Sequence, residues 1–251
     1  MTLDVIVAAR RRTRRRLTIA VLIGVGVLAA LVYPAGLYVN AHLDDGAMPS
    51  TPGPHTSAPA ATSSSDRAVL PADVSFIRVA GVDLPVSAAT GPAVTVGGLA
   101  RGFAHTRDGA VVAAVHLLVR TTEQVGPVVF EPTLADQVVG EYADAMRTYV
   151  ATAYAQAAAD AGITYGQPLG DLPAIVAGVR VDAYTDDHAT LSVLTSAVDA
   201  TSVTRHAATT VELSYTGGDW RLVAPRDGRW DTAVVVLDPD QIGGYPPLQG
   251  R

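Results

Sequence analysis

The segment VELSYTGGDWRL, residues 211–222, decides the fold that we predict from this sequence. Apolar and polar residues alternate over residues 211–215, which is the period of a strand with one buried face. Gly217 and Gly218 follow, and glycine tolerates the positive φ angles that a tight hairpin turn requires. The alternation then resumes up to Leu222. The segment therefore predicts two antiparallel strands joined by a short turn.

The same period-two pattern occurs upstream, over residues 175–184 and 191–195. Such alternation is typical of antiparallel strands that place one face on the core and the other in water. Further upstream, residues 74–86 predict one short strand followed by a loop through Pro85. The C-terminal half is expected to form a meander of long strands.

A strongly apolar helix is predicted before these strands. Residues 109–119 are apolar except for His116. Thr106 is the expected N-cap of this helix, and Asp108 complements the positive end of the helix dipole. A helix this apolar must be covered on most faces, so we expect it to lie inside the fold.

A second helical region is predicted between the apolar helix and the strands. It begins at Pro132, where Thr133 and Asp136 have capping-box spacing, and it ends at Gly162. Gly140 is placed to bend or split it. Helices followed by strands predict an α+β domain in which helices pack on one curved antiparallel sheet.

The N-terminus predicts a membrane anchor and its orientation. Six arginines lie within seven residues: Arg10, Arg11, Arg12, Arg14, Arg15 and Arg16. Residues 17–39 follow without a charge, and as a helix they would extend ~35 Å, enough to cross a ~30 Å hydrocarbon core. Arginine clusters stay on the cytoplasmic side, so the rest of the chain is expected outside the cell membrane.

Two alternatives for this segment keep the same orientation. Val39-Asn40-Ala41 resembles a signal-peptide cleavage site, although the apolar run is longer than a signal core. The stretch from Thr13 to Leu17 approximates a twin-arginine export signal. Both alternatives also place the remainder of the chain outside.

The predicted organisation has four parts. A basic cytoplasmic tail spans residues 1–16, a transmembrane helix 17–39, a disordered Pro/Ser/Thr/Ala linker 40–72, and an exported domain 73–251. Six Arg and one Asp give residues 1–41 a net charge of +5, whereas 12 Arg and 23 acidic residues give the remainder −11. An acidic exported domain argues against direct nucleic-acid binding.

The residues that are missing also restrict the chemistry. The chain has no Cys, and all 18 of its basic residues are Arg. Thiol nucleophiles, disulfides, Schiff-base lysines and phosphate loops of the Walker A type are thereby excluded. This composition is typical of a high-GC genome such as that of an actinobacterium.

Two sets of features carry resemblances to known proteins. Helices followed by long strands that end in the hairpin around Gly217 resemble the cone-shaped nuclear transport factor 2-like (cystatin-like) fold, over residues 101–224. The segments 81–87, 91–92 and 102–110 (GVDLPVS, GP and GFAHTRDGA) resemble motifs of uncharacterised actinobacterial proteins encoded with integrative conjugative elements. The bitopic assembly components of type IV secretion machines, including TcpC-type conjugation proteins, have a similar plan. The resemblance implies a membrane-anchored, non-enzymatic assembly subunit that contacts itself or secretion-channel subunits.

Candidate catalytic residues are few. Enzymes of the resembled fold use a His/Asp pair in the cone as a general base, and His116, Asp182 and Tyr184 are the polar residues expected to line it here. The alternative is a buried His116 that bonds a backbone carbonyl or a tyrosine hydroxyl. The acidic segment 186–188 (DDH) contains types of metal ligand, but it falls between two strands and predicts a solvated turn.

No catalytic residue, metal, cofactor or small-molecule ligand is therefore predicted. Two other functions stay open at this stage. One is a small-molecule-binding or isomerase/hydratase-type domain that uses the cone cavity, and the other is the extracytoplasmic domain of a cell-envelope regulator.

Overall fold

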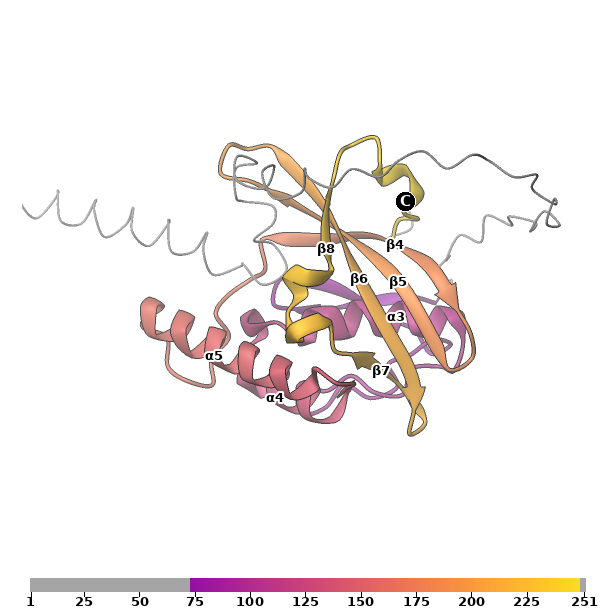
Figure 1. Cartoon of the computed structure of the whole chain (residues 1–251), viewed down its shortest axis with the longest axis horizontal. Helices are drawn as coiled ribbons and strands as arrows, with labels where there is room; N and C mark the ends of the chain where they lie inside the picture. Colours follow the sequence, from indigo (N-terminus) through magenta and orange to yellow (C-terminus); the bar gives the residue numbers. More distant parts are fainter. Residues whose placement is uncertain (1–72, 249–251) are drawn as a thin grey trace, which may run out of the picture.

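The structure is a computed structural model, and it describes residues 73–248. The six N-terminal arginines, the apolar run of residues 17–39 and the predicted linker 40–72 lie outside this range. Within it, three α-helices pack with a mixed β-sheet, so the predicted α+β class is confirmed (Figure 1). No helix in these residues is long and apolar enough to cross a membrane.

The sheet contains the four predicted long or hairpin strands and two short additions. Its strands are β3 (Val138–Val139), β4 (Ala174–Tyr184), β5 (His188–Val198), β6 (Thr204–Thr216), β7 (Asp219–Val223) and β8 (Val234–Leu237). Their order is β3-β7-β6-β5-β4, and β8 pairs with β6 beyond the end of β7. The predicted hairpin is confirmed, because Thr216 pairs with Asp219 and the two glycines between them have φ angles of 65° and 83°.

The prediction of a purely antiparallel sheet is wrong at one edge. β3 pairs in parallel with β7, where the Leu222 N–H donates to the Gln137 carbonyl at 2.9 Å. The β-branched Val138 and Val139 favour an extended backbone, and Gly140 has a φ of 94° that a helix does not allow. The second helical region is thus split into α4 (Pro127–Asp136) and α5 (Ala143–Ala161).

The predicted start of α4 at Pro132 and Thr133 is also wrong. The helix begins at Pro127, preceded by Gly126 with a φ of 79°. Thr133 therefore lies inside the helix, where its hydroxyl donates to the Val129 carbonyl at 2.8 Å. The predicted stop is confirmed, since α5 ends at Gly162 in the left-handed conformation.

The apolar helix α3 (Arg107–Arg120) lies where the sequence predicts, and its cap is confirmed. The Thr106 hydroxyl accepts from the Gly109 N–H at 3.1 Å, and Asp108 lies in the first turn. Every residue from Gly109 to Arg120 is buried. The helix packs across β4–β7 and also contacts α4 and the N-terminal hairpin, so all its faces are covered.

That N-terminal hairpin corrects the prediction of one strand and a loop. β1 (Ser75–Val79) and β2 (Val82–Val86) pair in antiparallel fashion around Ala80 and Gly81, whose φ angles are 46° and 81°. Pro85 lies within β2 opposite Phe76. A proline is tolerated there because the hairpin is a two-stranded sheet in which each strand has a free edge.

The remaining elements are short 3₁₀ turns. They are η1 (Glu123–Val125), η2 (Arg226–Gly228), η3 (Trp230–Ala233) and η4 (Ile242–Gly244). After η4 the chain runs beside β4, where the Val179 N–H donates to the Pro246 carbonyl at 3.1 Å. Tyr245 packs with Leu194 and Ala208 in a small second core. This C-terminal tail, residues 245–248, covers part of the free edge of β4.

Candidate functional site

His116 is buried and both of its ring nitrogens are occupied. Nε2 lies 2.8 Å from the Pro85 carbonyl, and Nδ1 lies 3.4 Å from Nε of Arg120. Burial lowers the pKa of His116 from 6.5 to about 3, against the opposing effect of the Pro85 bond. A neutral imidazole satisfies both contacts, since it donates from Nε2 and accepts at Nδ1. The backbone-carbonyl alternative thus describes His116 in this structure.

Asp182 lies in different surroundings from His116. Its two carboxylate oxygens accept from Arg180 Nε at 2.5 Å and from the Ser192 hydroxyl at 2.5 Å. Arg180 also lies over the Tyr245 ring, on the sheet face that the C-terminal tail covers. Alternate strand residues point to opposite faces, and α3 packs on the face of Leu191. The structure therefore does not bring Asp182 to His116 as a base and its orienting partner.

Tyr184 lies at the end of β4 beside the large aromatic residue of the hairpin. Its ring centroid is 6.1 Å from that of Trp220. Burial, with smaller contributions from the charges of Asp186 and Asp108, raises the pKa of its hydroxyl. Tyr184 is thus an aromatic contact near the sheet end, and no described bond joins it to His116.

Asp186 and Asp187 of the acidic segment lie in the turn between β4 and β5, and His188 begins β5. The Thr185 N–H donates to the His188 carbonyl at 2.8 Å, and the His188 N–H donates to the Thr185 hydroxyl at 3.1 Å. Among residues 73–248 no group of three or more histidine or acidic side chains is arranged to hold a metal ion.

A cluster that we did not predict fastens the loop before α3 to the β6–β7 hairpin. The Asp219 carboxylate accepts from the backbone N–H groups of Gly102 and Phe103 at 2.9 and 3.0 Å. The Trp220 indole donates to the Ala104 carbonyl at 2.9 Å. His105 stacks on the Tyr215 ring at a centroid distance of 3.6 Å. We call Asp219, Trp220, His105 and Tyr215 the hairpin clamp.

The clamp joins two of the sequence motifs that carry the resemblances. Residues 102–106 belong to GFAHTRDGA, and Asp219 and Trp220 belong to the hairpin GGDWR. Nothing in the separate motifs shows that they touch, because they are more than 110 residues apart in sequence. The contacts of the hairpin clamp hold the loop to the hairpin, and the polar atoms of the clamp residues bond largely to other groups of the chain.

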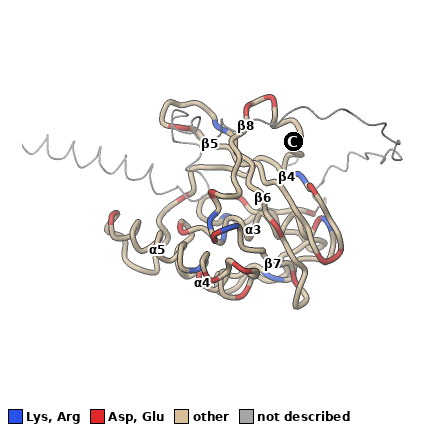
Figure 2. The backbone as a smooth tube through the Cα atoms, viewed as in Figure 1, with Lys and Arg blue, Asp and Glu red and all other residues tan. Residues whose placement is uncertain are grey.

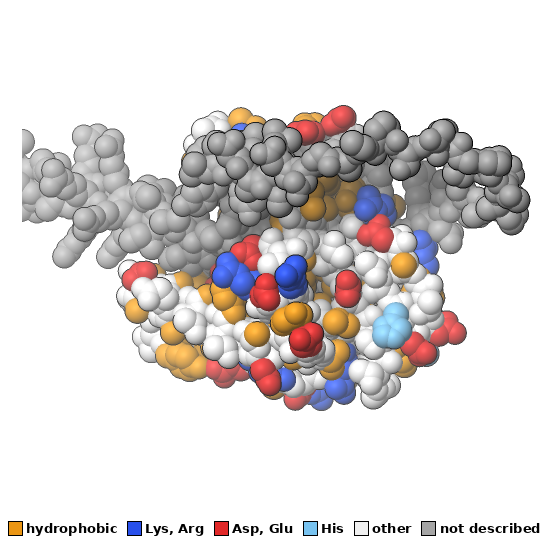
Figure 3. All heavy atoms as spheres, viewed as in Figure 1, with side chains coloured by type: hydrophobic (Ala, Val, Ile, Leu, Met, Phe, Trp, Pro, Cys, Tyr) orange, Lys and Arg blue, Asp and Glu red, His pale blue; other side chains and the backbone are white. Residues whose placement is uncertain are grey.

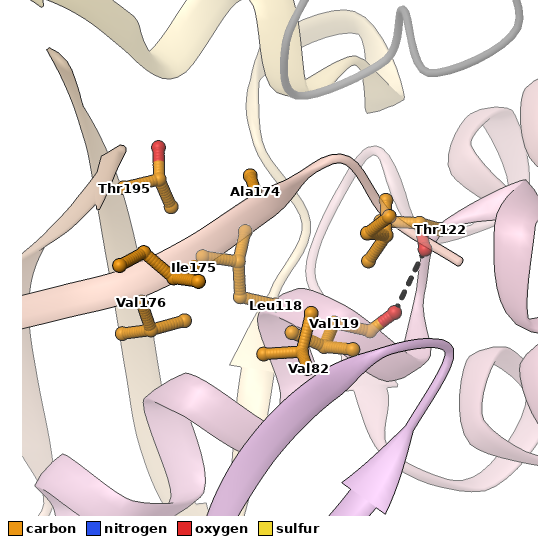
Figure 4. Close-up of a pocket in the computed structure, with 9 residues that line it drawn as sticks. Val82, Leu118, Val119, Thr122, Ala174, Ile175, Val176 and Thr195 are labelled. Carbon is orange, nitrogen blue, oxygen red and sulfur yellow. Dashed lines mark hydrogen bonds between the residues drawn. The ribbon is translucent and has the colours of Figure 1, made fainter. Parts of the chain in front are cut away.

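A small apolar hollow lies where the C-terminal end of α3 meets β2, β4 and β5. Its volume is about 30 Å³, and its lining residues are Val82, Leu118, Val119, Thr122, Leu172, Ala174, Ile175, Val176 and Thr195. In Figure 4 the Thr122 hydroxyl is turned to the Val119 carbonyl, to which it donates at 2.8 Å. No titratable side chain lines the hollow, so it offers apolar contact and no acid–base chemistry.

The strand β8 leaves an aliphatic edge exposed. It reads Val-Val-Val-Leu, and the side chains of Val235 and Val236 are 61% and 50% exposed. Val236 ends a row of side chains on one sheet face, in which Val176 pairs with Thr195, Thr195 with Ala207 and Ala207 with Val236. We call these four residues the distal row. It runs from the apolar hollow to the free edge of the sheet.

Most arginines of residues 73–248 form ion pairs, whereas many acidic residues do not. Residues 73–248 contain 10 Arg and 20 acidic residues, a net charge of −10. Ion pairs join Arg101 to Asp136, Arg180 to Asp182, Arg205 to Asp199 and Arg229 to Asp231. Figure 2 shows the two signs interspersed along the backbone, and in Figure 3 scattered charges lie among apolar side chains. No large basic face is present on the surface that Figure 3 shows.

The comparison with protein families assigns the chain. A family model described as a domain of unknown function, DUF8175, matches residues 39–241. The chain belongs to the DUF8175 family. In this DUF8175 protein the match includes the helices, all strands of the sheet and the residues before them back to the end of the apolar run. No curated protein and no solved structure matches the chain.

Proposed function

We propose that this DUF8175 protein is a single-pass membrane subunit that assembles with other proteins outside the cell membrane. The basic tail stays in the cytoplasm, residues 17–39 cross the membrane, and the linker presents the α+β domain at a distance. The resembled plan of helices followed by long strands favours a nuclear transport factor 2-like cone for this domain. It also favours a role in an actinobacterial conjugative, type IV secretion-like apparatus.

The observation that carries the proposal is the contrast between the interior and the edge of the sheet. In the interior, both nitrogens of His116 are engaged, and on the other sheet face Asp182 is held by Arg180 and Ser192. At the edge, Val235 and Val236 face solvent on an all-aliphatic strand. An exposed aliphatic edge marks a site of protein contact more often than a site of chemistry.

The apolar hollow supports a second candidate, the binding of a small aliphatic ligand. Its lining is apolar, and it lies between the C-terminal end of α3 and strands β2, β4 and β5. The enclosed space of about 30 Å³ has room for a water-sized group and is far below the roughly 300 Å³ of ordinary ligand pockets, so an aliphatic ligand would have to widen the hollow. The lack of titratable lining residues makes this candidate a binding site and not an isomerase or hydratase site.

Topology and membrane extraction test the anchor. The full chain should resist extraction with carbonate, and protease added outside intact cells should digest the domain. A variant that lacks residues 1–41 should be soluble after expression. A matched variant with all six arginines from Arg10 to Arg16 changed to Gln should lose the uniform orientation. Membrane retention of the truncated chain would show that a second attachment exists and that the single-anchor plan is wrong.

Measurement of conjugative transfer tests the proposed role in a secretion apparatus. Deletion of the gene from a donor strain should reduce transfer of the element, and the full chain should restore it. The chain without residues 1–41 should fail to restore transfer, although its domain is intact. Normal transfer from the deletion strain would refute the conjugative role and leave the anchor unaffected.

A further inference from the structure

We propose that β8 is a docking edge that accepts one extended strand from a partner protein, whose apolar segment is flanked by basic residues. This inference rests on the proposed function, because it names the kind of partner that the exported domain would hold. The docking mode is strand addition, in which backbone hydrogen bonds supply affinity and alternate side chains supply specificity.

The pairing of β8 leaves one of its edges open. Residues 234–237 pair with residues 206–209 of β6, and within residues 73–248 no strand pairs with the other side of β8. Natural edge strands are protected by short length, Lys, Pro or a covering segment. β8 is short, with four residues, but among residues 73–248 it has no Lys, no Pro and no covering strand, and it exposes Val235 and Val236 on opposite faces.

The opposite edge of the sheet provides an internal comparison. There β4 is covered by the C-terminal tail, through a bridge between Gly178 and Pro247 and a bond from the Val179 N–H to the Pro246 carbonyl. A Cβ at Gly178 would lie 2.6 Å from the Pro246 carbonyl oxygen, so the tail fits closely. Within residues 73–248, one edge is thus covered by the C-terminal tail and the other is open.

The negative charge next to β8 favours a partner strand with basic residues. Asp238 and Asp240 are exposed immediately after β8, whereas Asp231 before it is paired with Arg229. Two copies of the domain paired through β8 would each bring a net charge of −10. Like charges disfavour that pairing. A partner strand antiparallel to β8 with basic residues at its N-terminal end would meet Asp238 and Asp240.

A partner strand beside β8 would extend the distal row by one side chain. Val236 is the last member of the row Val176, Thr195, Ala207 and Val236 on one sheet face. A strand added beside β8 would place an alternate side chain next to Val236, as a fifth member. β-Branched residues pack well in such cross-strand rows, so the partner segment is expected to be rich in Val, Ile or Thr.

Alternate backbone methylation tests strand addition directly. The full chain in detergent would be titrated against a fluorescent peptide, Arg-Arg-Val-Thr-Val-Thr-Val-Thr, with fluorescence anisotropy as the readout. Two further peptides would carry N-methyl groups on alternate residues, one set for each edge of the peptide strand. Because alternate N–H groups point to opposite edges, one methylated peptide should lose about tenfold or more in affinity and the other less than about threefold.

Variants of the chain locate the binding edge. Val236→Lys should weaken binding of the peptide by about tenfold, because it removes apolar contact and repels the basic flank. Val128→Lys is the matched control, since Val128 is 63% exposed on α4, and it should leave binding unchanged. Asp238→Asn with Asp240→Asn should weaken binding by about threefold and reduce its dependence on salt.

Three results would overturn the inference. They are equal affinity of both methylated peptides, unchanged affinity of the Val236→Lys variant, and disulfide-linked homodimers of a Val235→Cys variant that form in place of peptide binding. The chain has no native Cys, so such a crosslink reports only on this position. A soluble, non-anchored chain that still binds the peptide would refute the proposed function alone. An anchored chain needed for transfer that fails the peptide tests would refute this inference alone.

Discussion

His116 is a titratable residue that burial holds neutral. The pKa is lowered from 6.5 to about 3, so between these values the unfolded chain binds a proton that the folded chain does not. The stabilising effect of a neutral His116 is therefore complete above pH 6.5 and is lost as the pH falls toward 3. The loss is roughly 1.4 kcal/mol per pH unit, or about 2 kcal/mol between pH 6.5 and 5.

Urea unfolding at several pH values measures this effect. The midpoint of the full chain should fall between pH 6.5 and 5, a range above the titration of ordinary carboxylates. His116→Gln should be less stable at pH 7, because Pro85 and Arg120 lose good partners, but its midpoint should change less with pH. The exposed His188→Gln is the control and should keep the original pH dependence. An unchanged slope in His116→Gln would contradict the assignment.

At the scale of elements, the sequence predicted those features that depend on neighbouring residues alone. The Thr106 cap, the hairpin at Gly217 and Gly218, and the buried α3 follow from capping, positive φ and apolar content, and all three are confirmed. β3 was missed because two residues make a strand only through the distant β7. Tertiary pairing overrides helix propensity at that point.

The candidate site shows the same limit. The sequence predicted His116 as a residue lining a cone, with burial against a backbone carbonyl as the alternative, and the structure buries it against Pro85. The sheet face that Asp182 occupies depends on strand register. The hairpin clamp and the open edge of β8 both depend on which segments meet in three dimensions. The sequence contains the four aliphatic residues of β8, but it does not indicate that they lie exposed at a sheet edge.

The hairpin clamp makes one loop depend on a single carboxylate. Asp219 accepts from the N–H groups of Gly102, Phe103 and its neighbour Trp220, at 2.9 to 3.0 Å. Asp219→Ala should lower the free energy of unfolding by about 2 kcal/mol, because these charge-assisted bonds are lost. Hydrogen exchange should speed up most over residues 102–106. Asp187→Ala, at an exposed turn, should change neither, and equal effects of the two variants would argue against the clamp.

At the scale of the whole molecule, we assign different roles to parts of the sheet. The packed interior and the covered β4 edge stabilise the fold, and the β8 edge is the proposed docking surface. The interior is filled by large side chains that include Trp220, Tyr154, Phe130 and Leu117. β4 is covered by the tail, and β8 is open. If the proposed anchor and docking edge are correct, the acidic domain meets its partner through β8. The tail matters to this arrangement because it keeps the second edge from competing.

Removal of the tail tests that division. A chain that ends at Gln241 loses Tyr245 and Leu248, which are 8% and 4% exposed, and it uncovers the edge of β4. Burial of two such side chains contributes about 3 kcal/mol, so the unfolding midpoint should fall accordingly. The uncovered edge should also cause self-association, visible by sedimentation velocity in detergent. A chain that ends at Leu248 is the matched control and should behave as the full chain does. If the chain ending at Gln241 is equally stable and no more associated, the tail does not protect β4. The comparison between a covered β4 edge and an uncovered β8 edge would then no longer support β8 as the docking edge.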